Sequence, residues 1–355
     1  MPLSRYQLLK EIYQDPDRKP IIRMFQDLIY LSFIYKEFPR HYFSRYLYKK
    51  ETTEIKNFMP NKILSRVAAF FNDRKFTEVT DNKLYFDLFY RQFNISLPKL
   101  LMYNHKRLFI IGNMSFEVNN ISDFILLLEK VFEMNSPCDS IFIKKTYASS
   151  IGTNTFKLFL YQFREDHKIV EKIYSGIINS EFLFQETVRQ HPELDKLTPA
   201  SLNTIRFDTF MDCNGKIDII SGYLRMSTTN NHVDSNMLGG VGVGINMISG
   251  KLKKAGFSKA RISGVKILTQ HPITGTKFEN FTIPFFDQAK QLVIEAARYI
   301  PAIRVVGWDV AISETGPVLI EGNSDYGINA SDMMDGGYLA NGPFQKVLGE
   351  IHFRN

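Results

Sequence analysis

Two apolar runs separated by a short polar segment restrict the fold of this chain more than any other feature. Residues 305–312 read VVGWDVAI, residues 317–323 read PVLIEGN, and the four residues between them are Ser-Glu-Thr-Gly. Apolar runs joined by a short loop that contains glycine are typical of a β-hairpin. We therefore predict a hairpin over residues 305–323, with its turn centred on Thr315.

The predicted hairpin separates acidic side chains from apolar ones. A turn at Thr315 places Asp309 opposite Glu321 and Gly307 opposite Asn323. Successive strand residues point to opposite faces, so Asp309, Glu321 and Asn323 share one face. The other face would pack on a core, and it carries Val306, Trp308, Val310, Ile312, Val318 and Ile320.

The acidic face predicts a metal site. Two carboxylates that lie opposite each other repel unless a cation neutralises them. Mg²⁺ prefers oxygen ligands in octahedral geometry and takes further ligands from phosphates and water. We therefore predict that Asp309, Glu321 and Asn323 hold Mg²⁺, with space for the ion above Gly307. The alternative is an edge hairpin with a solvated acidic face, which would not explain why an asparagine completes the acidic pair.

The hairpin also resembles a known family. Trp-Asp-Val-Ala-Ile at residues 308–312 and Leu-Ile-Glu-Gly-Asn at residues 319–323 are similar to the metal-binding hairpin of ATP-grasp ligases. Within that superfamily the chain resembles the sugar-transfer-associated ATP-grasp group, which occurs with glycan-assembly genes. The similarity covers about residues 80–340 and includes Gln185-Glu186, the run LNTIR at 202–206, Leu224-Arg225, Asp234 and Gly239-Gly240.

The resemblance implies the ATP-grasp fold, an α+β fold in which two α+β lobes clasp ATP, here preceded by an N-terminal helical domain. We expect the helical domain over residues 1–80, a lobe with a phosphate loop over residues 81–186, and a lobe with the metal site over residues 187–355. A chain of 355 residues is long enough for two or three domains that each bury a core. Its 44% hydrophobic and 23% charged residues are typical of globular rather than disordered proteins.

A stripe of large apolar residues marks the N-terminal region. Ile22, Phe25, Ile29 and Phe33 recur at helical spacing, and a second helix is expected over residues 62–71. One interpretation is that the stripe packs on the rest of the protein, with lysine and arginine stems at its edge. The other is that it rests on a membrane surface. Because stripes of this kind are usually core, we favour packing and keep peripheral membrane contact through these helices as the alternative.

Charge and composition narrow the partners and the compartment. A net charge of +7 suits anionic partners, which include nucleotide phosphates, acidic substrates, nucleic acid and anionic membranes. The resemblance, rather than the charge, implies ATP, Mg²⁺, a small-molecule or glycan carboxylate and an amine, and no nucleic acid. No apolar run approaches the roughly 20 residues that span a bilayer, and no signal peptide is recognisable, so we expect a cytoplasmic protein. The two cysteines, Cys138 and Cys213, lie in no zinc or disulfide pattern.

Two lysines and a polar loop are candidates for nucleotide binding. Lys83 opens the helical segment LYFDLFYRQF, and Lys144 ends an expected strand over residues 140–144. The resemblance implies that both lysines reach the phosphates of ATP; without it, Lys83 would be taken as a solvated helix residue. The loop after Lys144 is implied to close over the phosphates with Ser149, Ser150 and Gly152. This loop has one glycine where the family usually has several, so Lys145 is an alternative to Lys144.

The strand FLFQE at residues 182–186 resembles the interdomain strand that holds adenine in ATP-grasp enzymes. The resemblance implies that Gln185 and Glu186 contact the adenine or the ribose, between apolar walls that suit a base. The alternative is a buried strand that ends in a surface glutamate.

Two arginines are candidate catalytic residues. Residues 203–210 alternate like a strand, and Asn214-Gly215 indicates a tight turn into a second strand. Arg206 and Arg225 each interrupt one of these apolar strands, which is unfavourable unless the guanidinium meets an anion. A guanidinium binds phosphate or carboxylate with two hydrogen bonds. The alternative is an ion pair with a neighbouring Asp or Glu.

The family's reaction is carboxylate–amine ligation. ATP phosphorylates a carboxylate, an amine attacks the acylphosphate, and ADP and phosphate leave, with Arg206 or Arg225 on the carboxylate or acylphosphate. The resemblance places Asp234, Gly239 and Gly240 near the acceptor site. We expect an amide between an amino acid or other amine and a sugar acid, in bacterial surface-glycan biosynthesis. The alternatives are a phosphotransferase with the same nucleotide site and a non-catalytic nucleotide-binding partner of glycan-assembly enzymes.

Overall fold

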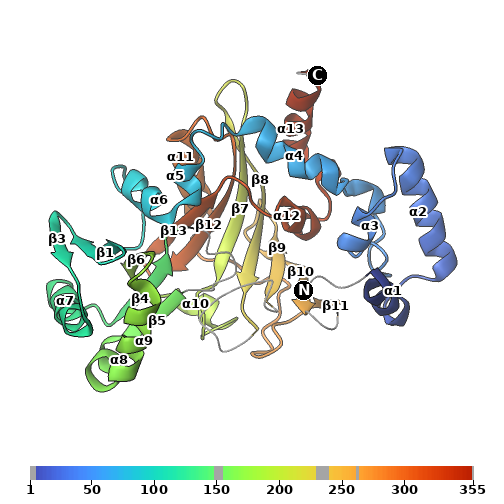
Figure 1. Ribbon diagram of the computed structural model, residues 1–355. Helices are drawn as coiled ribbons and strands as arrows, with labels where there is room; N and C mark the ends of the chain where they lie inside the picture. The colour runs from blue at the N-terminus through green and yellow to red at the C-terminus, as the bar shows by residue number, and fades with distance from the viewer. Residues whose placement is uncertain (1–4, 148–154, 229–239, 261–263, 354–355) are drawn as a thin grey trace.

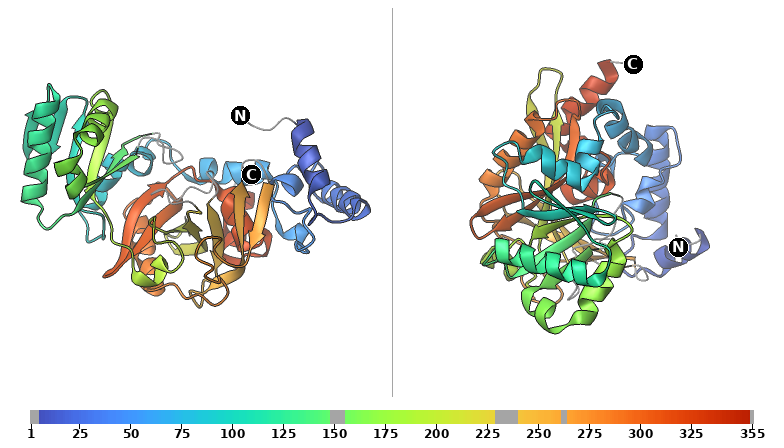
Figure 2. Two further views of the ribbon diagram at one scale, coloured as in Figure 1. Left: turned by 90° about the horizontal axis from the view of Figure 1, so that it is seen from below. Right: turned by 60° about the vertical axis from the view of Figure 1, so that its left-hand side comes forward.

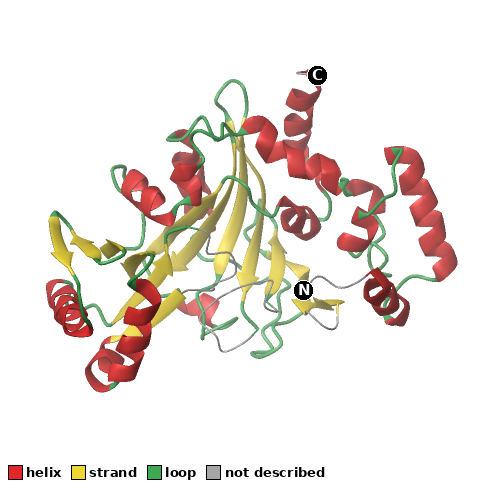
Figure 3. Ribbon diagram, in the orientation of Figure 1, coloured by secondary structure: helices red, strands yellow, loops and turns green. Residues whose placement is uncertain are grey.

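The described part of the chain contains two antiparallel sheets with flanking helices and a separate group of N-terminal helices, as Figure 1 and Figure 3 show. The computed structural model describes residues 5–147, 155–228, 240–260 and 264–353. Helices and antiparallel strands are mixed along the chain, so the predicted α+β class is confirmed. The three domain limits expected from the sequence stay a prediction.

The first sheet has six strands in the order β3-β2-β1-β6-β4-β5. Every neighbouring pair is antiparallel. Its strands are β1 (Leu100–His105), β2 (Leu108–Ile111), β3 (Met114–Glu117), β4 (Ser140–Lys145), β5 (Thr155–Phe159) and β6 (Glu181–Glu186). Its core, which includes Phe124, Ile173 and Phe184, is shared with α7 (Ile121–Met134), α8 (Leu160–Glu165) and α9 (His167–Ile177).

The second sheet has seven strands in the order β11-β10-β9-β8-β7-β12-β13, and these pairs are also antiparallel. Its strands are β7 (Thr204–Met211), β8 (Ile217–Met226), β9 (Val241–Ile245), β10 (Leu252–Ala260), β11 (Gly264–Leu268), β12 (Val305–Ser313) and β13 (Gly316–Asn323). Helix α11 (Phe286–Arg298) packs on one face, where Ala289 and Val293 share a core with Trp308. The opposite face, which carries Val305 and Phe210, packs on α4 (Asn61–Phe71), α12 (Ile328–Asp335) and α13 (Gly342–Phe353).

The hairpin of β12 and β13 has the predicted pairing but reaches it differently. Asp309 lies opposite Glu321 and Gly307 opposite Asn323, as predicted. The turn contains only two residues, and Ile320 is an extra residue that forms a β-bulge. A two-residue turn with a bulge has the same residue count as a longer turn without one. The cleft side of the hairpin therefore keeps the predicted register.

The bulge reverses the faces of the residues between it and the turn. Leu319 is fully buried in the core, whereas Val318 and Ile320 are only partly buried. The prediction that those two side chains pack on the core is therefore wrong. The expected space above Gly307 is also filled, because a Cβ there would lie 2.6 Å from Cγ of Tyr326.

The N-terminal helices α1 (Arg5–Gln14), α2 (Ile21–Tyr35) and α3 (His41–Ser44) contribute to a small separate core. The predicted apolar stripe on α2 faces away from that core: Ile22, Phe25, Ile29 and Phe33 are 76%, 65%, 56% and 83% exposed. The prediction that this stripe packs on the protein is therefore wrong. The physical reason is on the other side of the helix, where the buried Asp27 carboxylate forms an ion pair.

The helices of the N-terminal region and the first sheet lie at opposite ends of the molecule, with the second sheet between them (Figure 2). Three short helices lie in the connections between these parts. They are α5 (Glu78–Asp81) and α6 (Lys83–Tyr90), which precede β1, and α10 (Pro192–Asp195), which lies between β6 and β7. Among the described residues, no helix is both long enough and apolar enough to cross a membrane.

Candidate functional site

A cleft of about 820 Å³ lies between the two sheets. The first sheet contributes Phe142, Lys144, Lys157, Gln185 and Glu186 to its walls. The second sheet contributes Thr204, Arg206, Tyr223, Arg225, Asp309, Ile320, Glu321 and Asn323. Lys83 reaches the cleft from the first turn of α6. Nine residues predicted from widely separated segments of the sequence therefore line one cavity.

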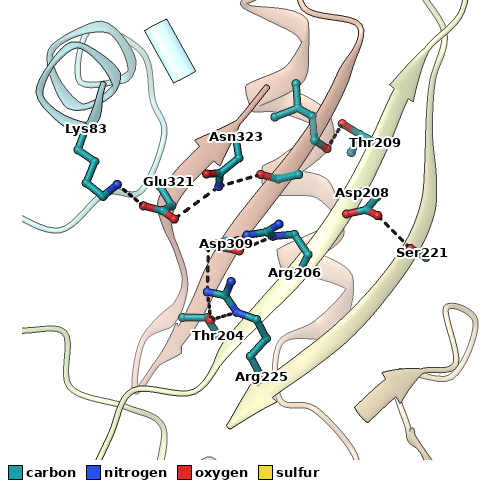
Figure 4. A network of polar contacts seen from close by, with 12 residues as sticks. Lys83, Thr204, Arg206, Asp208, Thr209, Ser221, Arg225, Asp309, Glu321 and Asn323 are labelled. Atoms are coloured by element: carbon teal, nitrogen blue, oxygen red, sulfur yellow. Dashed lines mark hydrogen bonds and ion pairs between the residues drawn. The ribbon is translucent and has the colours of Figure 1, made fainter. Parts of the chain in front are cut away.

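Asp309 is the centre of a buried ion-pair network in this cleft (Figure 4). Its Oδ1 lies 2.6 Å from Nε of Arg206, and its Oδ2 lies 3.1 Å from Nη2 of the same residue. Arg225 donates from Nη2 to Oδ2 at 2.9 Å and also binds the hydroxyl of Thr204. The anion that both arginines meet is thus a carboxylate of the protein, which was the alternative considered for them.

The two arginines differ in how freely they can contact a ligand. The side chain of Arg206 is 8% exposed and binds Asp309 through two nitrogens. The side chain of Arg225 is 19% exposed and binds Asp309 through one. Arg225, which also donates to the hydroxyl of Thr204, is therefore the more accessible of the two arginines.

Glu321 lies on the same face and carries the second carboxylate. Its Oε2 is 3.0 Å from Nζ of Lys83. Burial would raise the pKa of Glu321, but the charges of Lys83 and Lys144 outweigh burial and hold the pKa well below its ordinary value. Glu321 is consequently ionised across the physiological pH range.

Local structure fixes the positions of the two lysines. Asn82 caps α6 by accepting from the backbone N–H groups of Leu84 and Tyr85, and Lys83 N donates to Thr146 O at 2.7 Å. Lys144, near the end of β4, is 5% exposed and lines the cleft. Burial lowers the pKa of Lys144 to about 8, with Glu321 opposing the shift. The structure thus turns Lys144, and not its alternative Lys145, into the cleft.

The cationic side chains outnumber the anionic ones at this end of the cleft. Two carboxylates, Asp309 and Glu321, lie among Arg206, Arg225, Lys83 and Lys144. Such an excess of positive charge in a cavity with low-dielectric walls attracts anions such as phosphates and carboxylates.

Two of the three predicted magnesium ligands have oxygens that are suited to the ion, and the third is held by arginines. Asn323 uses its Nδ2 to donate to Gly307 O and Glu321 Oε1, and among the described residues its Oδ1 accepts no hydrogen bond. Glu321 and Asn323 therefore offer oxygens of the kind that Mg²⁺ prefers. Both oxygens of Asp309 accept hydrogen bonds from guanidinium groups, so these arginines compete with a metal ion for its lone pairs. The described residues contain no group of three His, Cys, Asp or Glu side chains that could hold a metal ion.

The two residues predicted to contact adenine, Gln185 and Glu186, differ in burial and in contacts. Gln185 is 4% exposed, and its Nε2 donates to Oδ2 of Asp87 at 2.7 Å. The side-chain amide of Gln185 is therefore bound to a residue of α6. Glu186, in contrast, is exposed at the end of β6. Phe142, which pairs with Gln185 across β4 and β6, supplies an apolar part of the same wall.

Several polar residues near the site were missed by the sequence analysis. Asp87 binds Gln185 and Arg91, and Asp208 accepts from the hydroxyl of Tyr338 at 2.6 Å. Burial raises the pKa of Asp208 to about 6. The available signal was a lone acidic residue inside an apolar element: Asp87 in LYFDLFYRQF and Asp208 two positions after Arg206.

Other predicted site residues cannot be placed in the cleft. Ser149, Ser150, Gly152, Asp234 and Gly239 lie outside the described residues. Gly240 is buried next to β9 and does not line the cleft.

Comparison with known proteins assigns most of the chain to a protein family. Residues 64–346 match the family described as sugar-transfer associated ATP-grasp. No curated protein matches this chain.

Solved structures similar to this chain include enzymes of several kinds. D-alanyl-alanine synthetase A from Vibrio cholerae O1 is 14% identical, with a TM-score of 0.44 over 76% of this chain and 65% of its own length. D-alanine–D-alanine ligase from Bacillus anthracis is 10% identical, with a TM-score of 0.41 over 78% of this chain and 68% of its own. N5-carboxyaminoimidazole synthetase from Staphylococcus aureus, solved with ADP, is 9% identical, with a TM-score of 0.41 over 72% of this chain and 48% of its own. The chain thus spans 65% of the first of these proteins and 48% of the last.

Proposed function

The chain belongs to the sugar-transfer associated ATP-grasp family, and from that premise we propose that it is an ATP-dependent carboxylate–amine ligase. The observation that carries this proposal is the cluster of lysines, arginines and acidic oxygens in one cleft between two antiparallel sheets. Phosphoryl transfer depends on positioning and on neutralising negative charge, and this cluster supplies groups for both.

Lys83 and Lys144 are the proposed phosphate ligands of ATP. Both line the cleft beside Glu321, and Lys144 is buried on the first sheet while Lys83 lies at the start of a helix. Phe142, Gln185 and Glu186 form the part of the wall that would contact the base and sugar. The proposal also includes Ser149, Ser150 and Gly152, which follow β4 in the sequence.

Magnesium is the proposed metal. Glu321 and Asn323 would hold it, with Asp309 as a third ligand in competition with its arginine partners. When bound, the ion neutralises charge on the phosphates and on the transferred phosphoryl group.

The reaction assigns separate tasks to the two arginines. A carboxylate oxygen of the substrate attacks the γ-phosphorus, the bond to the β-phosphate oxygen breaks, and ADP leaves. The amine then attacks the acyl carbon, phosphate leaves, and the nitrogen loses a proton to give the amide. Arg225, the more accessible arginine, would bind the carboxylate and acylphosphate, and Arg206 would hold Asp309 in place.

The family's association with sugar transfer supports a proposal for the substrate class. We propose a sugar acid as the carboxylate and an amino acid or other amine as the acceptor, in bacterial surface-glycan assembly. Asp234 and Gly239 remain the proposed acceptor-side residues, whereas Gly240 is buried outside the cleft and is no longer included.

The test is a screen for ADP release with Mg-ATP and pooled sugar acids and amines, followed by mass spectrometry of the products. We expect ADP, phosphate and an amide to form together, and Glu321→Gln to abolish all three. Glu279→Gln is a matched control, because Glu279 is exposed and outside the cleft. A phosphorylated product without an amide would assign a phosphotransferase instead. Failure to bind Mg-ATP would contradict any nucleotide-dependent function.

A further inference from the structure

The outer face of α2 exposes several large apolar side chains to solvent. We call this face the α2 stripe: Ile22, Phe25, Ile29 and Phe33, with Ile21, Tyr30, Ile34 and Phe38 beside them, all 44% exposed or more. Single exposed apolar side chains are ordinary, but a contiguous patch of this kind marks a surface that contacts a partner or a membrane.

The outward orientation of the α2 stripe is fixed by a buried charge. Asp27, on the opposite side of the helix, is 2% exposed and accepts from Lys19 Nζ at 2.9 Å and from the Tyr42 hydroxyl at 3.1 Å. Arg23 adds a contact 3.0 Å from the other carboxylate oxygen. Turning α2 to bury the stripe would break these bonds and leave Lys19 buried without its anion, which is strongly unfavourable. The exposed stripe is therefore a stable property of the fold.

The surroundings of the α2 stripe are positively charged. Residues 1–50 contain ten lysines and arginines and five aspartates and glutamates, so their net charge is +5, out of +7 for the whole chain. Arg23 lies on α2 itself, where it pairs with Asp27, and the exposed Lys36 and Arg40 follow the last turn with the exposed Glu37 between them. An apolar helical face bordered by basic residues is the signature of a helix that lies in a membrane interface.

We propose that the α2 stripe docks on the surface of an anionic lipid bilayer, with α2 lying in the plane of the interface. The aromatic and aliphatic side chains would enter the boundary between headgroups and acyl chains, and the basic residues would contact anionic headgroups. Two copies of this chain would instead bring together two regions of like net charge, +5 by sequence and +4 once the pair of Arg45 with Asp332 is counted, and these repel each other. The position of α2 at one end of the molecule leaves its outer face free to meet a flat surface (Figure 2).

The experiment is vesicle flotation of the full chain, independent of nucleotide or activity. Vesicles of phosphatidylglycerol and phosphatidylcholine are compared with vesicles of phosphatidylcholine alone. The test variant is Phe25→Glu/Phe33→Glu, and the matched control is Ile248→Glu, since Ile248 is 93% exposed in a turn of the second sheet. Thermal melting of each variant checks that the fold is intact, which is expected because all three side chains are exposed.

We expect the wild type and Ile248→Glu to float with the anionic vesicles and the double variant to partition at least about tenfold less. Binding should weaken with added salt and in Lys36→Glu/Arg40→Glu, because the headgroup contacts are screened or reversed. Equal flotation of the double variant, or no flotation of the wild type, would overturn the proposal. Wild-type dimers in sedimentation velocity that the double variant lacks, without vesicle binding, would assign the stripe to a second copy instead.

Discussion

Asp309 and Arg206 are direct partners across strands β12 and β7, and their side chains meet with 2.6 Å between Oδ1 and Nε. Both groups are almost completely buried. A buried ion pair of this kind often adds no stability compared with well-packed apolar residues, but the loss of one partner leaves a charge without compensation. The pair therefore makes the stability of the fold depend on a residue that the proposed function also needs.

Replacement of Asp309 by Asn should destabilise the protein. The buried guanidinium of Arg206 would lose its negative partner, so we expect the free energy of unfolding to fall by about 3 kcal/mol. Urea denaturation measures the change. Glu314→Gln, at the exposed turn of the same hairpin, is the control and should change stability by less than about 0.5 kcal/mol. A similarly small effect of Asp309→Asn would show that the pair with Arg206 is not formed in solution.

Replacement of Glu321 by Gln should remove the response to Mg-ATP. A ligand at about 100 times its dissociation constant stabilises the folded protein by roughly 2.7 kcal/mol, which is visible as a rise in melting temperature. We expect that rise in the wild type and in Glu279→Gln, and little of it in Glu321→Gln, which loses the charge between Lys83 and the proposed metal. Equal rises in all three proteins would mean that this hairpin does not hold the metal.

Replacement of Lys144 by Met should change how stability depends on pH. Burial lowers the pKa of Lys144 from 10.5 to about 8, so between these values the unfolded chain binds more protons than the folded protein. The contribution of Lys144 to stability therefore rises with pH across this window. The advantage of Lys144→Met over wild type in the free energy of unfolding should shrink by up to about 3 kcal/mol between pH 8 and 10.5.

Urea denaturation at several pH values measures this difference. Lys145→Met is the matched control, because Lys145 is the next residue, is less buried and does not line the cleft. A difference for Lys144→Met that stays constant with pH would show that Lys144 is not buried as a charged group.

Replacement of Arg45 by Met should destabilise the protein by removing one partner of a second buried ion pair. Arg45 Nε lies 2.9 Å from Asp332 Oδ2, and both side chains are nearly inaccessible. The single variant leaves the Asp332 carboxylate buried without a cation, which should cost about 3 kcal/mol of the free energy of unfolding. Arg45→Met/Asp332→Asn should recover at least half of that loss in the same urea experiment. A double variant no more stable than the single one would show that the carboxylate is not the source of the loss.

The pairing of the hairpin could be predicted because it follows from counting residues along two neighbouring strands. The predicted register of Asp309 with Glu321 is correct because the extra residue Ile320 compensates for a turn that is one residue shorter than predicted. The bulge at Ile320 could not be predicted, because a short turn with a bulge and a longer turn without one have the same count. For that reason the burial of Leu319 could not be predicted from the sequence.

The partner of the arginines depends on contacts between distant parts of the chain. The sequence indicated that Arg206 and Arg225 each need an anion, but Asp309 is about 100 and 80 residues away from them in the chain. The order of strands β8-β7-β12 brings the three together, and strand order is a non-local property.

Periodicity identified the residues that share the outer face of α2 but not the direction of that face. Both sides of the helix are largely apolar, so hydrophobic spacing alone could not choose the buried side. The informative residue was Asp27, whose carboxylate pairs with Lys19 inside the protein. A lone acidic residue in an apolar helix thus carried more information about orientation than the apolar residues themselves.

The bulge at Ile320 also changes the medium in which Glu321 acts. In a regular strand the neighbours of Glu321 would both face the core, but here Ile320 and Glu321 both line the cleft. A branched hydrocarbon side chain beside the carboxylate excludes water and lowers the local dielectric constant, and the attraction between opposite charges grows as the dielectric constant falls. One inserted residue thereby strengthens the ion pair between Lys83 and Glu321 without adding a charge.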